Sequence, residues 1–489
     1  MAADPAGAGA HLPFAFARDH QVILTGGRMI LGPGGEAAAL AEVRRAAGAP
    51  LAVEEVDAAA FARLLDAHYS TVAGQAEDSG ADIAFDLEET ETGARVQDLL
   101  EDAAEAPVIE LVNQLLRRAV RAGASDLHVE PLRDGIRARM RLDGTLYPIL
   151  EREDVPVRRI VSRLKVMAGL DTSETRLPQD GRIALRFGGR AIDLRFSSLP
   201  GQHGERLVLR ILDRQAGIRA LDDLGLSPAQ AAQLRRLAGR PNGIVLATGP
   251  TGSGKTTTLY SLLHLIDRRE RNVVTVEDPI EYELPGISQS QVNPDIGLTF
   301  AAGLRATLRQ DPDVILVGEI RDQETAKVAA QAALTGHLVL SSLHANGTLG
   351  AVTRLRDLGL DDYLIASTLR GVLAQRLVRR LCPACARAEP PAAELAHRLT
   401  AAGIPVPAMV RHAVGCPACS GTGHAGRVGI FEVAEIPDPM AAAIGQGAAE
   451  AELRALLDPG AETMTTSALR RIAAGEVSPE ELARVLGDL

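Results

Sequence analysis

The chain has 489 residues, 46% of them hydrophobic and 24% charged, with a formal net charge of −11. This composition is that of a soluble globular protein of about three domains. No apolar run approaches the ~20 residues that span a bilayer, and the first residues lack the basic segment and apolar core of a signal peptide, so we expect a cytoplasmic protein. With no Trp, 5 Tyr and 8 Phe, the chain is poorly suited to stack on the bases of single-stranded nucleic acid.

The acidity is concentrated at the N-terminal end. The first 105 residues hold 19 acidic residues against 6 Arg, so the rest of the chain is close to neutral. Residues 1–75 mix short apolar runs with a predicted helix at 57–69, which indicates a small separate α/β domain. Residues 76–105 are acidic and rich in Ala and Gly, which predicts a flexible linker. A solvated surface explains this acidity at least as well as a docking role does.

Regular structure is predicted to resume near residue 106. Apolar residues recur at helical spacing from Val108 to Val120 and predict one amphipathic helix. Alternation of apolar and polar residues then predicts strands at 136–142 and 192–196. We therefore place a second domain at 106–222.

Residues 249–256 read Gly-Pro-Thr-Gly-Ser-Gly-Lys-Thr, which matches the phosphate-binding pattern G-x-x-x-x-G-K-[ST] at every fixed position. A short apolar strand is predicted before the loop at 243–247, and a helix after it at 257–268. The glycines let successive N–H groups point at phosphate oxygens, and the helix N-terminus adds partial positive charge. Of the 52 basic residues only three are lysines, and one of them is Lys255. A compact ammonium fits this loop, whereas a planar guanidinium does not.

The loop pattern assigns roles to individual residues. Lys255 is expected to reach the β- and γ-phosphates of ATP, and Thr256 to hold Mg²⁺. A second apolar strand is followed by three carboxylates, which we expect at the same end of the sheet. The predicted nucleotide-binding residues are Gly249, Pro250, Thr251, Gly252, Ser253, Gly254, Lys255, Thr256, Thr257, Glu277, Asp278 and Glu281.

Two further predicted strands carry candidate catalytic residues. A buried strand is predicted at 313–317, and Glu319 follows it where ligands of open α/β sheets bind. Where such a strand ordinarily ends in Asp, this chain has Glu319, so water activation and Mg²⁺ binding are both assigned to that carboxylate. The next strand, 336–344, carries His337 and His344. Either histidine alone would be interpreted as a packed residue, but the nearby P-loop favours a catalytic role for His344.

The four cysteines form two C-x-x-C pairs, Cys382 with Cys385 and Cys416 with Cys419. Each pair points two thiolates at one metal ion, so we expect a structural Zn²⁺ site with four cysteine ligands. The 30 residues between the pairs predict a small inserted subdomain, at 382–424. Disulfides are disfavoured in a reducing cytosol, and a redox motif would not need two copies.

The order of these blocks resembles the secretion and pilus assembly ATPases of bacteria, most of all the type II secretion ATPases. After the P-loop, residues 275–281, 308–322 and 334–344 match the blocks that the family calls the Asp box, the Walker B box and the His box. The resemblance implies an α/β fold with a RecA-like ATPase core at 223–381 and a helical C-terminal part at 425–489.

The second domain resembles the PAS-like α+β domain that precedes this core, through residues 124–131, 178–182 and 203–206. In the family, arginines of this domain reach the nucleotide across a domain or subunit interface. Arg195 and Arg210 stand at the matching positions. An arginine finger of this kind neutralises the charge that develops on the γ-phosphate. In a chain so rich in Arg, a surface arginine on a strand is the alternative.

The resemblance also implies partners. Residues 1–75 resemble the docking domain of type II secretion ATPases, which binds the cytoplasmic domain of an inner-membrane partner. The implied assembly is a homo-hexameric ring, attached to the inner membrane through that partner and a polytopic platform protein. Its ATP hydrolysis would power pseudopilus assembly and protein export.

Three alternatives stay open at the level of sequence. A type IV pilus extension ATPase has the same core and a different docking domain; the tetracysteine insert is typical of assembly ATPases and generally absent from retraction ATPases. A RecA-type nucleic-acid motor is disfavoured by the nearly neutral body and the lack of Trp, so we expect no nucleic-acid partner. An inactive nucleotide-binding scaffold is disfavoured by intact Lys255, Thr256 and Glu319.

Overall fold

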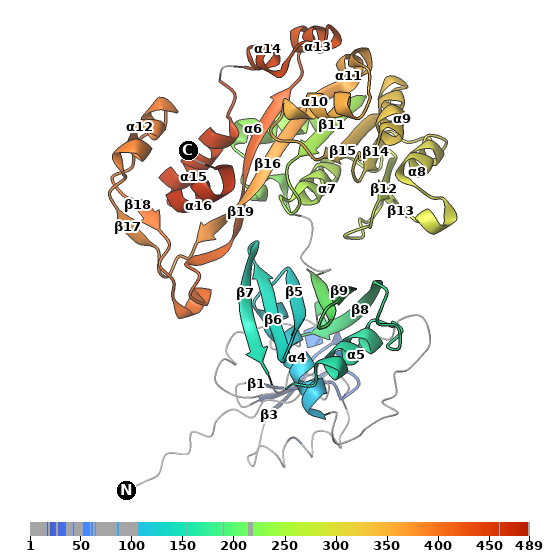
Figure 1. Ribbon diagram of the computed structural model, residues 1–489, viewed down its shortest axis with the longest axis vertical. Helices are drawn as coiled ribbons and strands as arrows, with labels where there is room; N and C mark the ends of the chain where they lie inside the picture. The colour runs from blue at the N-terminus through green and yellow to red at the C-terminus, as the bar shows by residue number, and fades with distance from the viewer. Residues whose placement is uncertain are drawn as a thin grey trace. The chain divides into compact units, whose positions relative to one another are not determined.

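The computed structural model describes most of the chain, namely residues 106–487 apart from 154, 189, 214–218 and 459, together with residues 86–87 and parts of 17–64. The chain divides into two compact units, Met1–Ala216 and Gly217–Leu489 (Figure 1). Each unit contains both helices and sheet, which confirms the predicted α/β class. Within the described ranges, no helix is both long enough and apolar enough to cross a membrane.

The first unit is built on a seven-stranded antiparallel sheet of order β4-β8-β9-β10-β5-β6-β7. Its helices and longer strands are α4 (Ala106–Arg121), β5 (Asp126–Leu132), β6 (Gly135–Leu142), β7 (Thr145–Arg152), α5 (Val157–Met167), β8 (Gln179–Phe187), β9 (Arg190–Gly201) and β10 (Gly204–Asp213). These bounds confirm the helix predicted from Val108 to Val120 and the strands predicted at 136–142 and 192–196.

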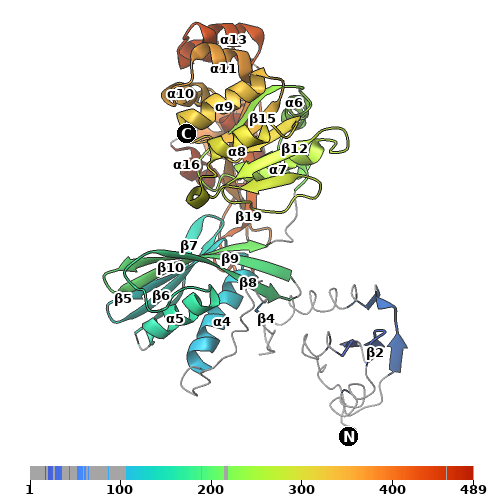
Figure 2. The same ribbon diagram turned by 90° about the vertical axis from the view of Figure 1, so that its right-hand side faces the viewer.

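Among the described residues, the helices of this unit cover one face of the sheet (Figure 2). Apolar residues of α4 and α5, such as Leu116 and Leu164, pack with Ile183, Leu194 and Leu209 of the sheet in one buried core. Because side chains of a strand alternate between faces, the residues between these apolar positions lie on the other face. That face carries the polar and charged residues, Arg195 and Arg210 included.

Part of the predicted linker pairs with the sheet of the first unit. The two-residue strand β4 (Asp86–Leu87) lies antiparallel to β8, with Asp86 opposite Arg186. The prediction of a flexible linker is therefore wrong for residues 86–87; the rest of 76–105 lies outside the described residues. Composition missed this strand because an open sheet edge offers N–H and C=O groups to a neighbouring extended segment whatever its side chains.

A separate small sheet lies near the N-terminus, formed by β1 (Val22–Thr25), β2 (Arg28–Leu31) and β3 (Ala52–Glu55). β2 pairs antiparallel with β1 and parallel with β3. Ile23 and Ile30 share one face and pack with Phe61. Most of the helix predicted at 57–69 lies outside the described residues.

The second unit is built on another seven-stranded sheet, of order β13-β12-β14-β15-β11-β16-β19. All strands are parallel except β19, which pairs antiparallel with β16. The strands are β11 (Gly243–Thr248), β12 (Val273–Glu277), β13 (Ser288–Gln291), β14 (Val314–Val317), β15 (Leu338–Leu343), β16 (Leu369–Leu381) and β19 (His424–Glu435). Every residue of β11, β12, β14 and β15 is buried, as expected for parallel strands covered on both faces.

Helices cover both faces of this sheet. On one face, Leu234 of α6 and Leu262 of α7 pack against Val245 of β11. On the other, Leu304 of α8 and Ala329 of α9 pack with β14 and β15. The helices up to the cysteine segment are η1 (Leu221–Leu224), α6 (Pro228–Ala238), α7 (Lys255–Leu265), η2 (Pro294–Ile296), α8 (Phe300–Thr307), α9 (Gln323–Leu334), α10 (Gly350–Asp357) and α11 (Asp362–Thr368).

The cysteine segment is inserted between β16 and β19. It contains β17 (Arg387–Glu389), α12 (Ala393–Ala401), β18 (Val410–His412) and η3 (Pro417–Cys419), and the chain ends with α13 (Asp438–Gly445), α14 (Glu450–Arg454), α15 (Met464–Ala473) and α16 (Pro479–Leu486). The predicted helical part at 425–489 is wrong for its first eleven residues, which belong to β19. Buried residues such as Val428, Ile430 and Val433 give this stretch a partner in β16, and that long-range pairing decides its structure.

Candidate functional site

The P-loop joins β11 to α7 at the carboxyl end of the parallel strands. Gly249, Gly252 and Gly254 have φ of 141°, 76° and 89°, a backbone region that other residues rarely adopt. Gly254 is the N-cap of α7 and provides no side chain to cap the helix, whereas Asp322 caps α9 with its carboxylate. The first-turn N–H groups of α7 are therefore left to bind an anion.

Lys255 lies over the loop that precedes it. Its Nζ donates to the backbone oxygens of Gly249 at 2.9 Å and Pro250 at 3.1 Å. Burial lowers the pKa of Lys255 from its ordinary value. Thr256 is exposed and Thr257 is half-buried. The ammonium is held by two neutral carbonyls, which a phosphate would outcompete as a partner.

The predicted base and the predicted histidine lie close to one another. Glu319 follows β14, His344 follows β15, and His344 Nε2 lies 3.5 Å from Glu319 Oε2. Arg321 also contacts Glu319, and its guanidinium lies 3.9 Å from a carboxylate oxygen of Asp278. Burial, followed by the positive charges of Lys255 and Arg321, lowers the pKa of His344. The P-loop lysine, Glu319 and His344 therefore share one site at the carboxyl ends of neighbouring strands.

The three carboxylates after β12 differ in their surroundings. Glu277 is only 2% exposed, and Tyr260, Thr275 and Gln289 all donate hydrogen bonds to it. Burial and the nearby Glu277 raise the pKa of Tyr260, which stays a donor. The carboxylate of Glu277 is thus bound by the protein itself.

Asp278 and Glu281 lie nearer to solvent than Glu277 does. The side chain of Asp278 is 41% exposed and belongs to the Arg321 and Glu319 cluster. Glu281 is half-buried, and its backbone N–H donates to the Tyr260 hydroxyl. Of the three acidic residues predicted to bind nucleotide, Asp278 therefore lies in the cluster around Glu319.

Arg195 and Arg210 belong to the first unit and face each other on neighbouring strands. Arg195 of β9 is paired in register with Arg210 of β10 and with Arg182 of β8. An open pocket of about 490 Å³ contains all three arginines. Arg210 Nε lies 3.3 Å from a carboxylate oxygen of Asp126. The structure thus brings the two predicted arginines together with a third, in a pocket that Asp180 also lines.

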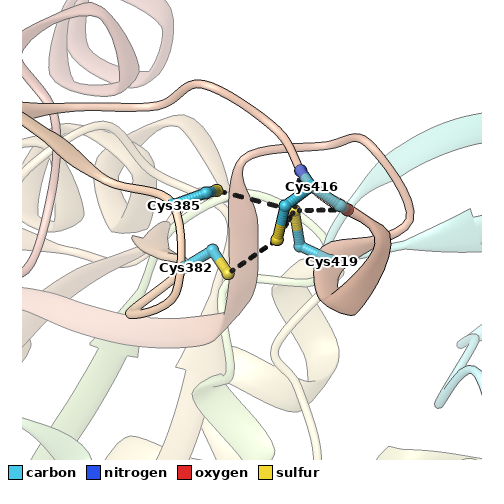
Figure 3. Close-up of side chains that lie close together, drawn as sticks. All are labelled: Cys382, Cys385, Cys416 and Cys419. Atoms are coloured by element: carbon cyan, nitrogen blue, oxygen red, sulfur yellow. Dashed lines mark hydrogen bonds between the residues drawn. The ribbon is translucent and has the colours of Figure 1, made fainter.

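The four cysteines converge on one point, although the two pairs are about 30 residues apart in sequence (Figure 3). All four Sγ atoms lie within 4.8 Å of one another. The Sγ atoms of Cys382 and Cys416 are 3.9 Å apart, those of Cys385 and Cys419 are 3.9 Å apart, and those of Cys416 and Cys419 are 3.7 Å apart. Zinc–sulfur bonds of about 2.3 Å in a tetrahedron place sulfurs about 3.8 Å apart, so the cluster fits Zn²⁺.

Backbone amides support this cysteine cluster. Cys419 Sγ accepts from the N–H groups of Cys416 and Gly423, both at 3.2 Å. Burial opposes the thiolate of Cys419, but these hydrogen bonds outweigh it and lower its pKa to about 6. A thiolate of this kind is the form that binds a metal.

Several residues of the site had no signal in the sequence. Tyr260, Gln289 and Arg182 are ordinary residues of a helix and two strands, and their roles arise from neighbours far along the chain. Arg321 follows Glu319 closely and could have been found as a charge beside the predicted base. Arg182 ends the block 178–182, which carries the resemblance of the second domain but points to no role for Arg182.

Comparison with known proteins gives a family. The family model described as Type II/IV secretion system protein matches residues 101–484, and a model of one domain of GSPII protein E matches residues 11–69. Type II secretion system protein E of Dickeya dadantii is 47% identical over 484 residues, covering 97% of this chain and 96% of its own. Type II secretion system ATPase E of Vibrio cholerae is 46% identical over 452 residues, covering 91% of this chain and 90% of its own.

Solved structures agree with this assignment. The pilus retraction motor PilT, solved with bound ADP, has a TM-score of 0.52 and 26% identity, over 76% of this chain and 95% of that one. The Legionella pneumophila ATPase DotB has a TM-score of 0.57 over 76% of this chain and 94% of that one, and at 23% identity it shows likeness of fold. The chain belongs to the type II/IV secretion system protein family and, within it, to the type II secretion system E proteins.

Proposed function

We propose that the chain is the Mg²⁺-dependent ATP-hydrolysing motor of a type II secretion system, and that it powers pseudopilus assembly and protein export. The observation that carries the proposal is the convergence of Lys255, Glu319 and His344 at the uncapped N-terminus of α7. Two relatives also support the proposal. They are named type II secretion system protein E and type II secretion system ATPase E, and they are 47% and 46% identical over 97% and 91% of this chain.

Each group has a defined task in hydrolysis. Backbone N–H groups of residues 249–257 and the Lys255 ammonium bind the phosphates. Thr256 and, through water, the carboxylate of Glu319 would hold Mg²⁺, which neutralises phosphate charge when bound. Glu319 orients and deprotonates the attacking water, and His344 beside it sets the position of that carboxylate.

The arginines of the first unit act from outside this site. Arg195 and Arg210 would approach the γ-phosphate when nucleotide joins the two units, within one chain or between neighbouring chains of a homo-hexamer. A reorientation of the units after hydrolysis would then be the power stroke. Residues 1–75 would dock on the cytoplasmic domain of an inner-membrane partner, and the ring would dock on a polytopic platform protein. These two contacts would transmit the power stroke. The match of residues 11–69 to a domain of GSPII protein E supports this docking role.

The four cysteines would hold a structural Zn²⁺, away from the phosphate-binding loop. The fit of their sulfur separations to a tetrahedron supports this assignment. We also propose domain boundaries after residues 75, 105, 222, 381 and 424.

Hydrolysis is tested by single substitutions in the full chain. Glu319→Gln should lower kcat by about 10²–10³-fold, as expected for loss of a general base, with nucleotide binding retained. Lys255→Ala should abolish binding and turnover, and should fail to restore secretion in a strain that lacks the protein. Glu270→Gln, an exposed carboxylate outside the site, is the matched control. Unchanged turnover in Glu319→Gln would refute the assignment of the base.

The system that the motor serves is tested by capture from membranes. We expect the full chain to retain a type II platform component, and a chain that begins at residue 106 to lose it. Retention of a type IV pilus component in its place would make the protein a pilus extension ATPase. A rise in ATP turnover on addition of DNA would favour a nucleic-acid motor.

A further inference from the structure

The strand next to β11 carries a buried glutamine at the level of the P-loop. Ala374 of β16 pairs with Thr248, the last residue of β11, so the next residue, Gln375, lies beside the start of the loop. Gln375 is 2% exposed. Its Nε2 donates to the backbone oxygen of Ser253 at 2.6 Å. Residues 122 positions apart in sequence thus meet inside the phosphate-binding loop.

The backbone of Gln375 also limits the space under the loop. A methyl group added at Gly249 would lie 2.4 Å from the backbone oxygen of Gln375, and one added at Gly254 would lie 3.0 Å from Gln375 Nε2. Both glycines of the pattern therefore pack directly on this residue. Gln375 is in contact with the beginning and the end of the loop.

The hydrogen bond to Ser253 has a consequence for phosphate binding. In a trans peptide the C=O and the following N–H point in opposite directions. Because the Ser253 carbonyl is held against Gln375, the N–H of Gly254 points away from Gln375. That N–H is one of the groups on which the phosphate depends.

Two complementary atoms in the same contact are left without a hydrogen bond. Gln375 Oε1, an acceptor, and Ser253 Oγ, a donor, are both buried and have no partner among the described residues. Ser253 is 3% exposed. A buried polar atom without a partner costs about 1–3 kcal/mol and calls for an explanation. A hydrogen bond from the Ser253 hydroxyl to Gln375 Oε1 would satisfy both atoms at once.

We propose that Gln375 is a positioning residue for the nucleotide: its amide N–H fixes the Ser253–Gly254 peptide, and its Oε1 receives the Ser253 hydroxyl when phosphate occupies the loop. The proposal rests on the proposed function and adds a residue from β16 to it. Gln375 does not touch the phosphate; it acts through the backbone of the loop. Its loss should weaken nucleotide binding, because the loop must then be ordered at the expense of binding energy.

The test uses the full chain and a fluorescent ADP analogue as the probe. Gln375→Met keeps the size of the side chain and removes both polar atoms. It should raise Kd for the nucleotide about tenfold, as expected for one or two lost hydrogen bonds. Gln375→Glu should raise it further, since a carboxylate would face the Ser253 carbonyl and the phosphates. Ser253→Ala should raise Kd about threefold and leave the thermal midpoint of the nucleotide-free protein unchanged.

A matched control separates positioning from folding. Gln230 is equally buried, at 2% exposure, and its Nε2 donates to the backbone oxygen of Phe431 at 2.9 Å. Gln230 Oε1 also accepts from the Ser227 N–H at 3.1 Å, so Gln230→Met should lower the thermal midpoint at least as much as Gln375→Met does and leave nucleotide Kd unchanged. Should Gln375→Met bind nucleotide like the parent, or should both Met variants weaken binding equally, the proposal is overturned.

A further comparison distinguishes this proposal from the proposed function. If the effects of Gln375→Met and Ser253→Ala on the free energy of nucleotide binding add up in the double variant, the shared hydrogen bond is refuted. Two residues that share a hydrogen bond should give a joint effect smaller than the sum of the single effects. A parent chain that bound no nucleotide would instead refute the ATPase, and this proposal with it. If the parent binds nucleotide and Ser253→Ala binds it with the same affinity, the ATPase assignment stands. The proposed role of Gln375 Oε1 is then contradicted.

Discussion

His344 Nε2 lies 3.5 Å from Glu319 Oε2, so the two residues that follow β15 and β14 meet at the carboxyl ends of the parallel strands. Burial and the charges of Lys255 and Arg321 lower the pKa of the histidine below its ordinary value of 6.5. A lowered pKa means that the ring is neutral at pH 7. Arg321 contacts Glu319 Oε1, so neutral imidazole leaves Oε2 available to water, whereas imidazolium would bind it as an ion pair.

This relationship predicts the acid limb of the pH profile. ATP turnover should be constant from pH 8 to about pH 6.5 and fall below it, as His344 takes up a proton and pairs with Glu319. His344→Gln should have lower kcat at pH 7 and a flatter profile below about pH 6.5, because the amide stays neutral. His397→Gln, an exposed histidine of α12, should keep the parent profile. An acid limb unchanged in His344→Gln would assign it to another group.

The buried Tyr260 hydroxyl predicts a link between α7 and the end of β12. Tyr260→Phe leaves Glu277 with fewer donors and should lower stability by about 1.5–3 kcal/mol, the value of a hydrogen bond to a charged group. Asp278 follows Glu277, so kcat should also fall several-fold. Thermal melts and initial rates measure both effects. The exposed Tyr363 is the control, and Tyr363→Phe should match the parent; a Tyr260→Phe protein as stable as the parent would contradict the link.

The basic row on the first unit predicts a shared effect of three arginines. Arg195→Ala and Arg210→Ala should each lower kcat by about 10³-fold, as for an arginine finger, with little change in nucleotide Kd. Arg182→Ala should have a smaller effect of the same kind, because Arg182 lies in the same row. Arg133→Ala, at an exposed turn, should leave turnover unchanged. If both Arg195→Ala and Arg210→Ala keep the parent's kcat, neither residue is the arginine finger.

The cysteine cluster predicts a metal that stabilises one end of the core sheet. Cys382 directly follows β16 and Cys419 lies five residues before β19 begins, so the metal would tie the two strands together at that end. One zinc ion per chain is expected by native mass spectrometry. Its removal by a chelator, or Cys416→Ser, should lower the thermal midpoint by roughly 5–10 °C. A purified chain that lacks zinc and melts at the same temperature would rule the site out.

Much of the site was predictable because its residues are contiguous in sequence. The P-loop, Glu319 after its strand and the two C-x-x-C pairs are local patterns whose chemistry follows from residue type and spacing. The features that the sequence did not predict are formed by contacts between residues far apart in the chain. Residues 425–435 became β19 because β16 offered them a partner, and the hydrogen bonds that Tyr260 and Gln289 donate to Glu277 come from residues outside β12.

The sequence by itself determined the family, the phosphate-binding loop, the candidate base and the two cysteine pairs, because each is written within a short stretch or in pairs of fixed spacing. Only the tertiary structure decided which side chains surround them. It brought His344 to Glu319, Arg182 into line with Arg195 and Arg210, and Gln375 under the P-loop. The physical reason is that strand order and register set these contacts, and neither is encoded near the residues that meet.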